Sequence, residues 1–211
     1  MPNLAIIVHE NPIMRSGFNF QISQIGGFHS AECNNAESAL SDCKKLKPSL
    51  AIISFSIPSM GAIQLTERLK AHSPHIKVIV SASEKSGFIA EKSILNGASG
   101  YITSEISVPD FVTAVKTVHH DSTYIEPCVS NNLALKKING REHLLDSLSP
   151  REFDVFAKVI QDKTAKKVAE ELFLAEKTVA NYISAVKKKL RTKTSAGLLR
   201  IGLEEGIATP P

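Results

Sequence analysis

Tryptophan is absent from this sequence of 211 residues, and cysteine occurs only three times, as Cys33, Cys43 and Cys128. The cysteines are widely spaced and contain no C-x-x-C pair, which excludes a disulfide framework and a cysteine-rich zinc site. No apolar run approaches the ~20 residues that a membrane-spanning helix needs. The first ten residues lack the basic region and the apolar length of a signal peptide. We therefore expect a cytoplasmic protein without membrane contacts.

Charge is distributed unevenly along the chain. Residues 1–146 carry 13 basic and 13 acidic residues, whereas residues 147–211 carry 12 basic and 8 acidic ones, so the net charge of +4 resides in the last third. Residues 177–193 contain six Lys or Arg residues and no acid. This excess indicates either a polyanionic partner for the C-terminal part or a solvated helix face, and charge alone does not decide between them.

Short apolar runs alternate with helical spacing over the first ~125 residues. Runs of four to six apolar residues bounded by turn residues are typical of buried parallel strands. The expected strands are Leu4–Val8, Phe28–Glu32, Leu50–Phe55, Val78–Val80 and Tyr101–Thr103. The expected helices are Pro12–Ile25, Ala36–Leu46, Gly61–Ala71, Lys85–Leu95 and Val108–His119. Five β-α repeats predict an α/β fold, a doubly wound parallel five-stranded sheet of the flavodoxin type with ligands at the carboxyl ends of its strands.

Several features of residues 3 to about 127 resemble the receiver domain of bacterial response regulators, and the NarL/FixJ group is the most similar. They include the order of elements, Pro58 after the third strand, Gly97-Ala98-Ser99-Gly100-Tyr101 before the fifth strand, and Thr123-Tyr124-Ile125-Glu126-Pro127 at the end. The resemblance implies a pocket with an acid pair that holds Mg²⁺, an Asp phosphoacceptor, a Ser or Thr, and a Lys.

The expected pocket is degenerate in this chain. His9 and Glu10 occupy the positions of the acid pair, Ser54 that of the acceptor Asp, and Ser104 that of the Lys. The Ser/Thr position falls on Ser81 or Ala82, and Tyr101 keeps the switch-aromatic position. A serine hydroxyl without a base does not replace an ionised carboxylate, and one carboxylate is a poor Mg²⁺ site. We therefore expect no Asp phosphorylation, no metal and no cofactor; the pocket is either structural filler or a repurposed site.

Other chemistry finds little support in the sequence. A Ser54–His9 nucleophile pair would need an orienting group and an oxyanion site, and neither is visible, so we expect no enzyme activity.

The connecting segment, residues 128–147, contains Asn139-Gly140, which marks a turn, and a short helix is expected at Asn132–Ile138. Residues 1–127 and 148–211 are then the two expected domains.

Residues 148–211 predict four helices. Ser149, Pro150 and Glu152 form a helix start of the capping-box type, and further helices begin near Thr164, Glu176 and Thr194. Two short helices joined by about three residues have the geometry of a helix-turn-helix. Leu148-Ser149-Pro150-Arg151-Glu152, Val168-Ala169-Glu170-Glu171-Leu172, Glu176-Lys177-Thr178-Val179-Ala180-Asn181-Tyr182, Lys189-Leu190 and Ala196-Gly197-Leu198-Leu199 together resemble the LuxR-type (GerE) DNA-binding domain. Asp162 and Ala175 depart from the usual Gly and Ser of that family.

The LuxR-type resemblance implies a set of DNA-binding residues. Ala180, Asn181 and Ser184 match positions that approach base edges, while Lys177, Thr178 and Lys188 match positions that hold phosphates. The full expected set is Thr164, Lys166, Lys177, Thr178, Val179, Ala180, Asn181, Ser184, Lys187 and Lys188. The helical period nevertheless points Val179, Ile183, Val186 and Leu190 inward. Leu198, Leu199 and Leu203 are either core or a dimer seam.

The leading hypothesis is a transcription regulator that binds inverted-repeat, double-stranded DNA as a homodimer without Asp phosphorylation, its input being protein level, a partner protein or a ligand. One alternative is a protein-interaction module whose receiver sequesters another regulator, with DNA binding secondary. Another is a regulator phosphorylated on Ser54 or Ser56. A resemblance to sigma-factor region four is weaker, because no core-binding region precedes the helix-turn-helix.

Overall fold

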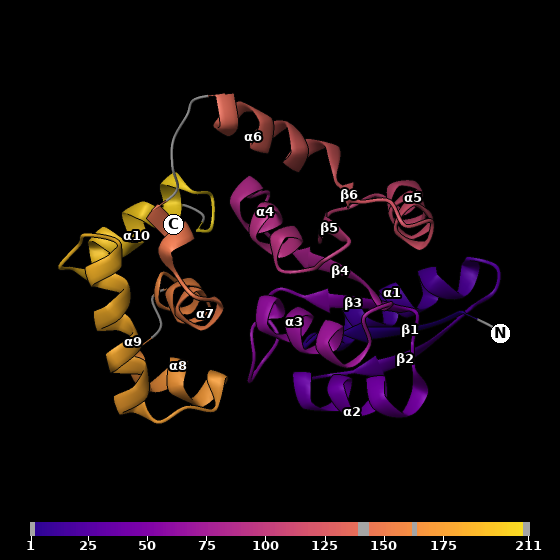
Figure 1. Cartoon of the computed structure of the whole chain (residues 1–211), viewed down its shortest axis with the longest axis horizontal. Coiled ribbons are helices and arrows are strands. Elements are labelled where there is room, and N and C mark those ends of the chain that lie inside the picture. Colours follow the sequence, from indigo (N-terminus) through magenta and orange to yellow (C-terminus); the bar gives the residue numbers. More distant parts are fainter. Residues whose placement is uncertain (1–2, 139–143, 162–163, 209–211) are drawn as a thin grey trace.

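The computed structural model describes residues 3–138, 144–161 and 164–208, with a parallel sheet covered by helices followed by a helical bundle (Figure 1). The strands form one sheet in the order β2-β1-β3-β4-β5-β6, and all their pairings are parallel. Their bounds are β1 Asn3–Val8, β2 Phe28–Cys33, β3 Leu50–Ser54, β4 Lys77–Ala82, β5 Gly100–Thr103 and β6 Tyr124–Ile125. The doubly wound α/β architecture is thereby confirmed, and the expected five strands gain a sixth.

Helices cover both faces of the sheet, as the alternation of strands and helices predicts. These helices are α1 Pro12–Gln24, α2 Ala36–Leu46, α3 Ala62–His72, α4 Gly87–Leu95 and α5 Val108–His119. Phe18 of α1 and Phe111 of α5 pack with Ile52 in one core, whereas Ile63 of α3 and Phe88 of α4 pack with Ile53 in another. Adjacent residues of β3 thus enter opposite cores because side chains alternate along a strand.

The connecting segment begins as a helix packed on the sheet-bearing part. Helix α6 runs over Pro127–Ile138, so it starts five residues before the expected Asn132. It lies against α4 so closely that a Cβ on Gly87 would be 2.9 Å from the Leu133 backbone. A short 3₁₀ helix, η1, follows at Leu144–Ser147. The turn expected at Asn139-Gly140 lies outside the described residues.

The C-terminal part contains α7 Pro150–Val159, α8 Ala165–Leu172, α9 Glu176–Lys189 and α10 Ser195–Glu204. The expected capping box is confirmed, because Ser149 and Glu152 each hydrogen-bond the other's backbone N–H. Phe173 ends α8 in the left-handed conformation, with φ of 51°, and turns the chain into α9. Val155, Val168, Ala169, Leu172 and Val179 form the small core that fixes α7, α8 and α9 together.

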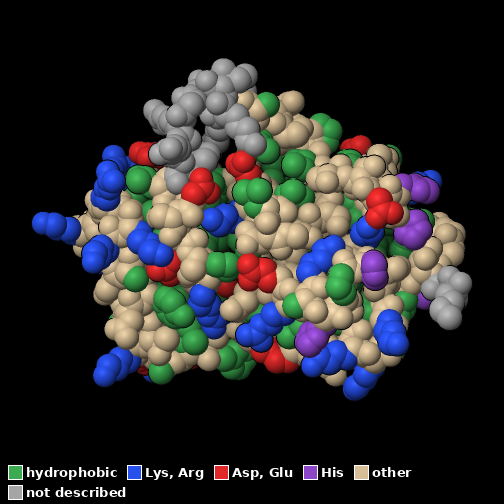
Figure 2. Space-filling view, in the orientation of Figure 1, with side chains coloured by type: hydrophobic (Ala, Val, Ile, Leu, Met, Phe, Trp, Pro, Cys, Tyr) green, Lys and Arg blue, Asp and Glu red, His purple; other side chains and the backbone are tan. Residues whose placement is uncertain are grey.

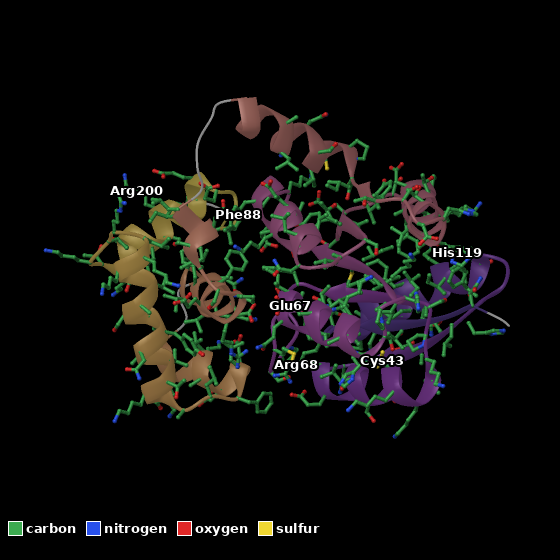
Figure 3. All side chains as sticks on the ribbon, viewed as in Figure 1. Cys43, Glu67, Arg68, Phe88, His119 and Arg200 are labelled. Atoms are coloured by element: carbon green, nitrogen blue, oxygen red, sulfur yellow. The ribbon has the colours of Figure 1, made fainter. Side chains whose placement is uncertain are left out.

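The two parts share a continuous apolar core. Phe153 of α7 is fully buried, with its ring centroid 6.1 Å from that of Phe55 and 5.6 Å from that of Phe88. Figure 3 shows Phe88 reaching from α4 toward α7. Helix α7 therefore lies between the sheet-bearing part and α9 (Figure 1).

In the described ranges, no helix combines the length and the apolar character needed to cross a membrane.

Candidate nucleic-acid interface

Helix α9 is anchored at both ends of its buried side. Val179 and Val186 are buried, and Leu190 follows them as the buried C-cap. The Nζ of Lys189 lies 2.6 Å from Oε2 of Glu152, and it also donates to the Ser147 carbonyl at 2.9 Å. The end of α9 is thus attached to the start of α7. Among the described residues, no helix or strand covers the opposite side of α9.

The uncovered side carries most of the residues that the LuxR-type resemblance assigns to DNA. Figure 2 shows Lys and Arg side chains projecting along the left edge of the molecule, where α9 and α10 lie in Figure 1. The exposed members of the expected set on α9 are Lys177, Ala180, Asn181, Ser184 and Lys188. Two more, Thr178 and Lys187, are half-buried. This combination of small, amide and cationic side chains suits contact with base edges and phosphates.

Val179 is the exception in the expected set. Its side chain has no exposed surface and packs in the core between α7, α8 and α9. The expectation that Val179 contacts DNA is therefore wrong for this structure, and the inward direction given by the helical period is correct. Val179 positions α9 instead of facing solvent.

The expected residues of α8 lie at its start. Thr164 is exposed and is the N-cap, with its hydroxyl accepting from the Lys167 backbone N–H, while Lys166 is exposed in the first turn. Arg191 and Lys193, just after α9, are also exposed and belong to the same basic run. The LuxR-type resemblance gives Arg191 and Lys193 no role, and the signal for them in the sequence is the absence of acids over residues 177–193.

The first turn of α9 lacks a side-chain cap. Ala175 has the extended backbone of an N-cap, with φ of −71° and ψ of 142°, but no side-chain hydrogen bond. This agrees with the departure from Ser noted in the sequence. The other departure, Asp162, lies outside the described residues.

The three leucines of α10 do not share one environment. Leu198 is buried in the continuous core, Leu199 is 37% exposed, and Leu203 is half-buried. Leu198 is therefore a core residue. Leu199, Leu203 and the exposed Arg200 (Figure 3) leave an accessible side on α10.

The residues expected at the receiver pocket lie at the carboxyl ends of the strands, and two of them are serines on neighbouring strands. Ser54 and Ser81 pair in register between β3 and β4, and both are buried. This places Ser81 beside Ser54, while Ala82 pairs with Thr103. The Ser54 hydroxyl accepts from the Ser56 backbone N–H at 3.3 Å.

His9 and Glu10 follow β1 at the same edge of the sheet. His9 is buried, and burial is the main reason that its pKa is lowered, so the ring is neutral at pH 7. Its Nδ1 accepts from the Asn11 backbone N–H at 3.0 Å. Arg15 donates to the His9 carbonyl at 2.7 Å and lies 3.3 Å from the Glu32 carboxylate. A guanidinium therefore supplies the positive charge in this region.

The last two pocket positions differ in their exposure to solvent. Tyr101 is fully buried and donates its hydroxyl to the Glu84 carbonyl at 2.7 Å, and burial raises its pKa well above the usual value. Ser104 is exposed, with its backbone N–H bonded to the Ala82 carbonyl. In the part of the chain that the structure describes, no group of three or more His, Cys, Asp or Glu side chains is arranged to hold a metal ion.

Family profiles match both parts of the chain. The response regulator receiver domain matches residues 5–116, and the luxR family of bacterial regulatory proteins (GerE) matches residues 146–201. The chain therefore belongs to the response regulators, with a receiver domain followed by a LuxR-type helix-turn-helix domain. It is a transcription factor of that class.

Relatives match this assignment over nearly the whole chain, and a solved structure has the same fold. The response regulator GacA of Pseudomonas aeruginosa is 26% identical over 207 residues, and the transcriptional activator protein ExaE of Pseudomonas putida is 25% identical over 206 residues; each match covers 96% of both chains. RcsB of Salmonella enterica serovar Typhimurium, in a structure bound to the promoter rprA, has the same fold with a TM-score of 0.72 and 20% identity. That match covers 95% of this chain and 98% of the other.

Proposed function

We propose that this response regulator is a cytoplasmic, sequence-specific transcription factor that binds inverted-repeat DNA as a homodimer, and that its binding does not depend on Asp phosphorylation. Helix α9 enters the major groove, with Asn181, Ser184 and Ala180 at base edges. Lys177, Thr178, Lys187 and Lys188 contact phosphates, together with Thr164 and Lys166 of α8.

The observation that carries this proposal is the accessibility of α9 while the two domains are docked. Lys177, Asn181 and Lys188 are exposed, although α7 is packed against the receiver in the same structure. A side chain that is already accessible needs no release step before it meets a duplex. The position of the positive charge also supports phosphate contacts, because the acid-free run of residues 177–193 lies on and just after α9.

The receiver pocket supports phosphorylation independence. Ser54 replaces the acceptor Asp, and Ser104, which replaces the Lys, is exposed at the surface. Arg15 bonds the backbone carbonyl of His9 and pairs with Glu32, so a cation already lies beside the end of β1.

Dimerisation follows from the energetics of half-sites. One helix-turn-helix domain contacts too few base pairs to be specific, so pairing on an inverted repeat supplies the rest. RcsB, a structural relative, has been solved as two dimers bound to two parallel DNAs. The accessible side of α10 around Leu199 offers a seam for such a pair in this chain.

A second candidate function is a protein-interaction module with DNA binding secondary. The observation that favours it is an exposed apolar side on α1, where Ile13 is 80% and Phe20 61% exposed. A single helix face of this kind suits a protein partner, which agrees with an input through another regulator.

The experiment that separates the two candidates uses one amide-bearing residue in each part of the molecule. Asn181→Ala removes the exposed amide of α9, and Asn131→Ala removes a comparable exposed amide on α6. On a duplex selected by the wild-type protein, the first variant is expected to lose about tenfold in affinity and the second to lose none. Unchanged regulation and affinity in Asn181→Ala would favour the interaction module.

A further inference from the structure

The boundary between the two domains contains a buried carboxylate that the proposed function does not use. Asp154 of α7 is 5% exposed, and its Oδ2 accepts from the Gly61 backbone N–H at 3.2 Å. Gly61 is the N-cap of α3, and a Cβ at this position would overlap the Asp154 carboxylate. The absence of a side chain at position 61 thus allows the two domains to meet at this point.

The segment that meets Asp154 is the loop directly after Ser54. The Ser59 backbone N–H donates to the Glu171 carbonyl at 2.7 Å, and the Ser59 carbonyl accepts from Arg151 at 3.4 Å. Lys158 reaches the Ser56 carbonyl at 3.5 Å. The domains are therefore joined by backbone groups of residues 56–61, and these bonds exist only while α7 is docked.

The charged groups around Asp154 do not neutralise it fully. On α7, Arg151 approaches to 3.9 Å, but its two hydrogen bonds go to the carbonyls of Ser59 and Leu172. Lys158, also on α7, forms an ion pair with Glu171 at 3.2 Å. From α3, Glu67 adds negative charge, and Figure 3 labels it on the side of α3 nearest α7. An ionised Asp154 would thus be a buried, incompletely compensated charge, which is costly.

We infer that the contact between Asp154 and Gly61 is a proton-linked latch: the domains stay docked while Asp154 carries a proton, and they separate more readily once it ionises. This inference does not depend on DNA binding. It makes the docking of the receiver on the LuxR-type domain sensitive to pH near neutrality.

The sign follows from the two states of Asp154. Burial, opposed by Arg151, raises the pKa of the docked Asp154 to about 7, whereas a solvated Asp titrates near ~3.9. Between these two pKa values, docking of the domains is therefore accompanied by the uptake of a proton on Asp154. The docked state is thus favoured as pH falls through 7. The docking equilibrium is expected to weaken roughly tenfold from pH 6 to pH 8 and to level off above that.

Amide hydrogen exchange in the full-length protein tests the latch. The Ser59 and Gly61 amides are bonded across the boundary, whereas the amide of Ile52 lies in the centre of the sheet. With intrinsic rates divided out, protection of the Ser59 and Gly61 amides is expected to fall about tenfold from pH 6 to pH 8, whereas the Ile52 amide stays the more strongly protected at both pH values and shows that the receiver remains folded. If protection of the Ser59 and Gly61 amides is the same at pH 8 as at pH 6, the proposal is overturned.

Neutral variants test whether Asp154 is the responsible group. Asp154→Asn keeps the shape and carries no titrating proton, so its Ser59 and Gly61 protection is expected to be independent of pH. Asp154→Ser, neutral and smaller, answers the same question if the amide variant does not fold, and protection of Ile52 reports on folding. A tenfold pH dependence that persists in either folded variant contradicts the latch.

Discussion

The ammonium group of Lys189 lies 2.6 Å from the carboxylate of Glu152, which joins the last turn of α9 to the first turn of α7. Glu152 also receives the Ser149 backbone N–H of the capping box at 2.7 Å. Although burial acts to raise it, these hydrogen bonds lower the pKa of Glu152. The same carboxylate therefore caps the N-terminus of α7 and forms an ion pair with the C-terminal turn of α9.

Lys189→Met is expected to destabilise the chain by on the order of 1 kcal/mol, because Glu152 keeps its buried charge but loses a charged donor. Lys188→Met removes an exposed neighbour and is expected to change the free energy of unfolding by less than ~0.5 kcal/mol. Urea denaturation measures both. Equal effects of the two substitutions would show that the Lys189–Glu152 pair does not stabilise the fold.

The same pair predicts a pH dependence. Because the pKa of Glu152 is lowered in the folded state, its contribution is complete above the unfolded value of ~4.3 and is lost as pH falls through the folded pKa. The stability difference between wild type and Lys189→Met is therefore expected to shrink in acid. Denaturation curves at pH 7 and pH 3.5 measure it, and a constant difference would refute this assignment.

Ala175→Ser is expected to stabilise α9 by about 1 kcal/mol, because the backbone of residue 175 already has N-cap geometry and lacks only a side-chain acceptor. Ala180→Ser places the same residue in the middle of the helix, where it is expected to be neutral or slightly destabilising. The comparison is made by thermal or urea unfolding. A gain at position 180 that matched the gain at position 175 would argue against a missing cap.

Gly61→Ala is expected to separate the domains without unfolding either one. The backbone of Gly61, with φ of −67° and ψ of 157°, suits alanine, and the atoms nearest to the new methyl group are those of the Asp154 carboxylate. Calorimetry is expected to show one transition for the wild type, whose core is continuous, and two for Gly61→Ala. Gly26→Ala, where a Cβ has open space, is the control. A single unshifted transition in Gly61→Ala would mean that docking does not require residue 61 to lack a side chain.

Much of the fold could be predicted from the sequence, because buried strands and amphipathic helices alternate clearly in it. The capping box at Ser149 and the starts of α2 and α5 follow from local chemistry, and the structure has them at the predicted residues. Strand β6 was missed because two residues carry no periodicity. The early start of α6 was missed although Pro127 suits a first helical turn.

For the candidate site, the sequence predicts which side chains are exposed only where the helical period alone decides it. The exposed side of α9 follows from its period, and Val179 is misplaced only where the family resemblance overrode that period. The contact of Asp154 with Gly61 was not predictable, because an acidic residue in a helix is usually solvated and its burial depends on a partner 93 positions away. Tertiary packing, not local pattern, decides such positions.

If Lys188, which is exposed on α9, contacts phosphate as proposed, Lys188→Met is expected to weaken binding to all duplexes about equally and to reduce the salt dependence of affinity by about one counterion. Lys116→Met, on an exposed position of α5 in the receiver, is the matched control and should change neither quantity. Fluorescence anisotropy over a range of salt concentrations gives the affinity and its salt dependence for each variant. A loss confined to one target sequence would instead place Lys188 at a base edge.

The most direct measurement compares the affinity of the purified protein for an inverted-repeat target before and after incubation with acetyl phosphate and Mg²⁺. We predict tight binding by the untreated protein at low ionic strength, no incorporated phosphate at Ser54, and the same affinity after treatment. Binding that appears only after treatment, together with phosphate on the receiver, would contradict the account.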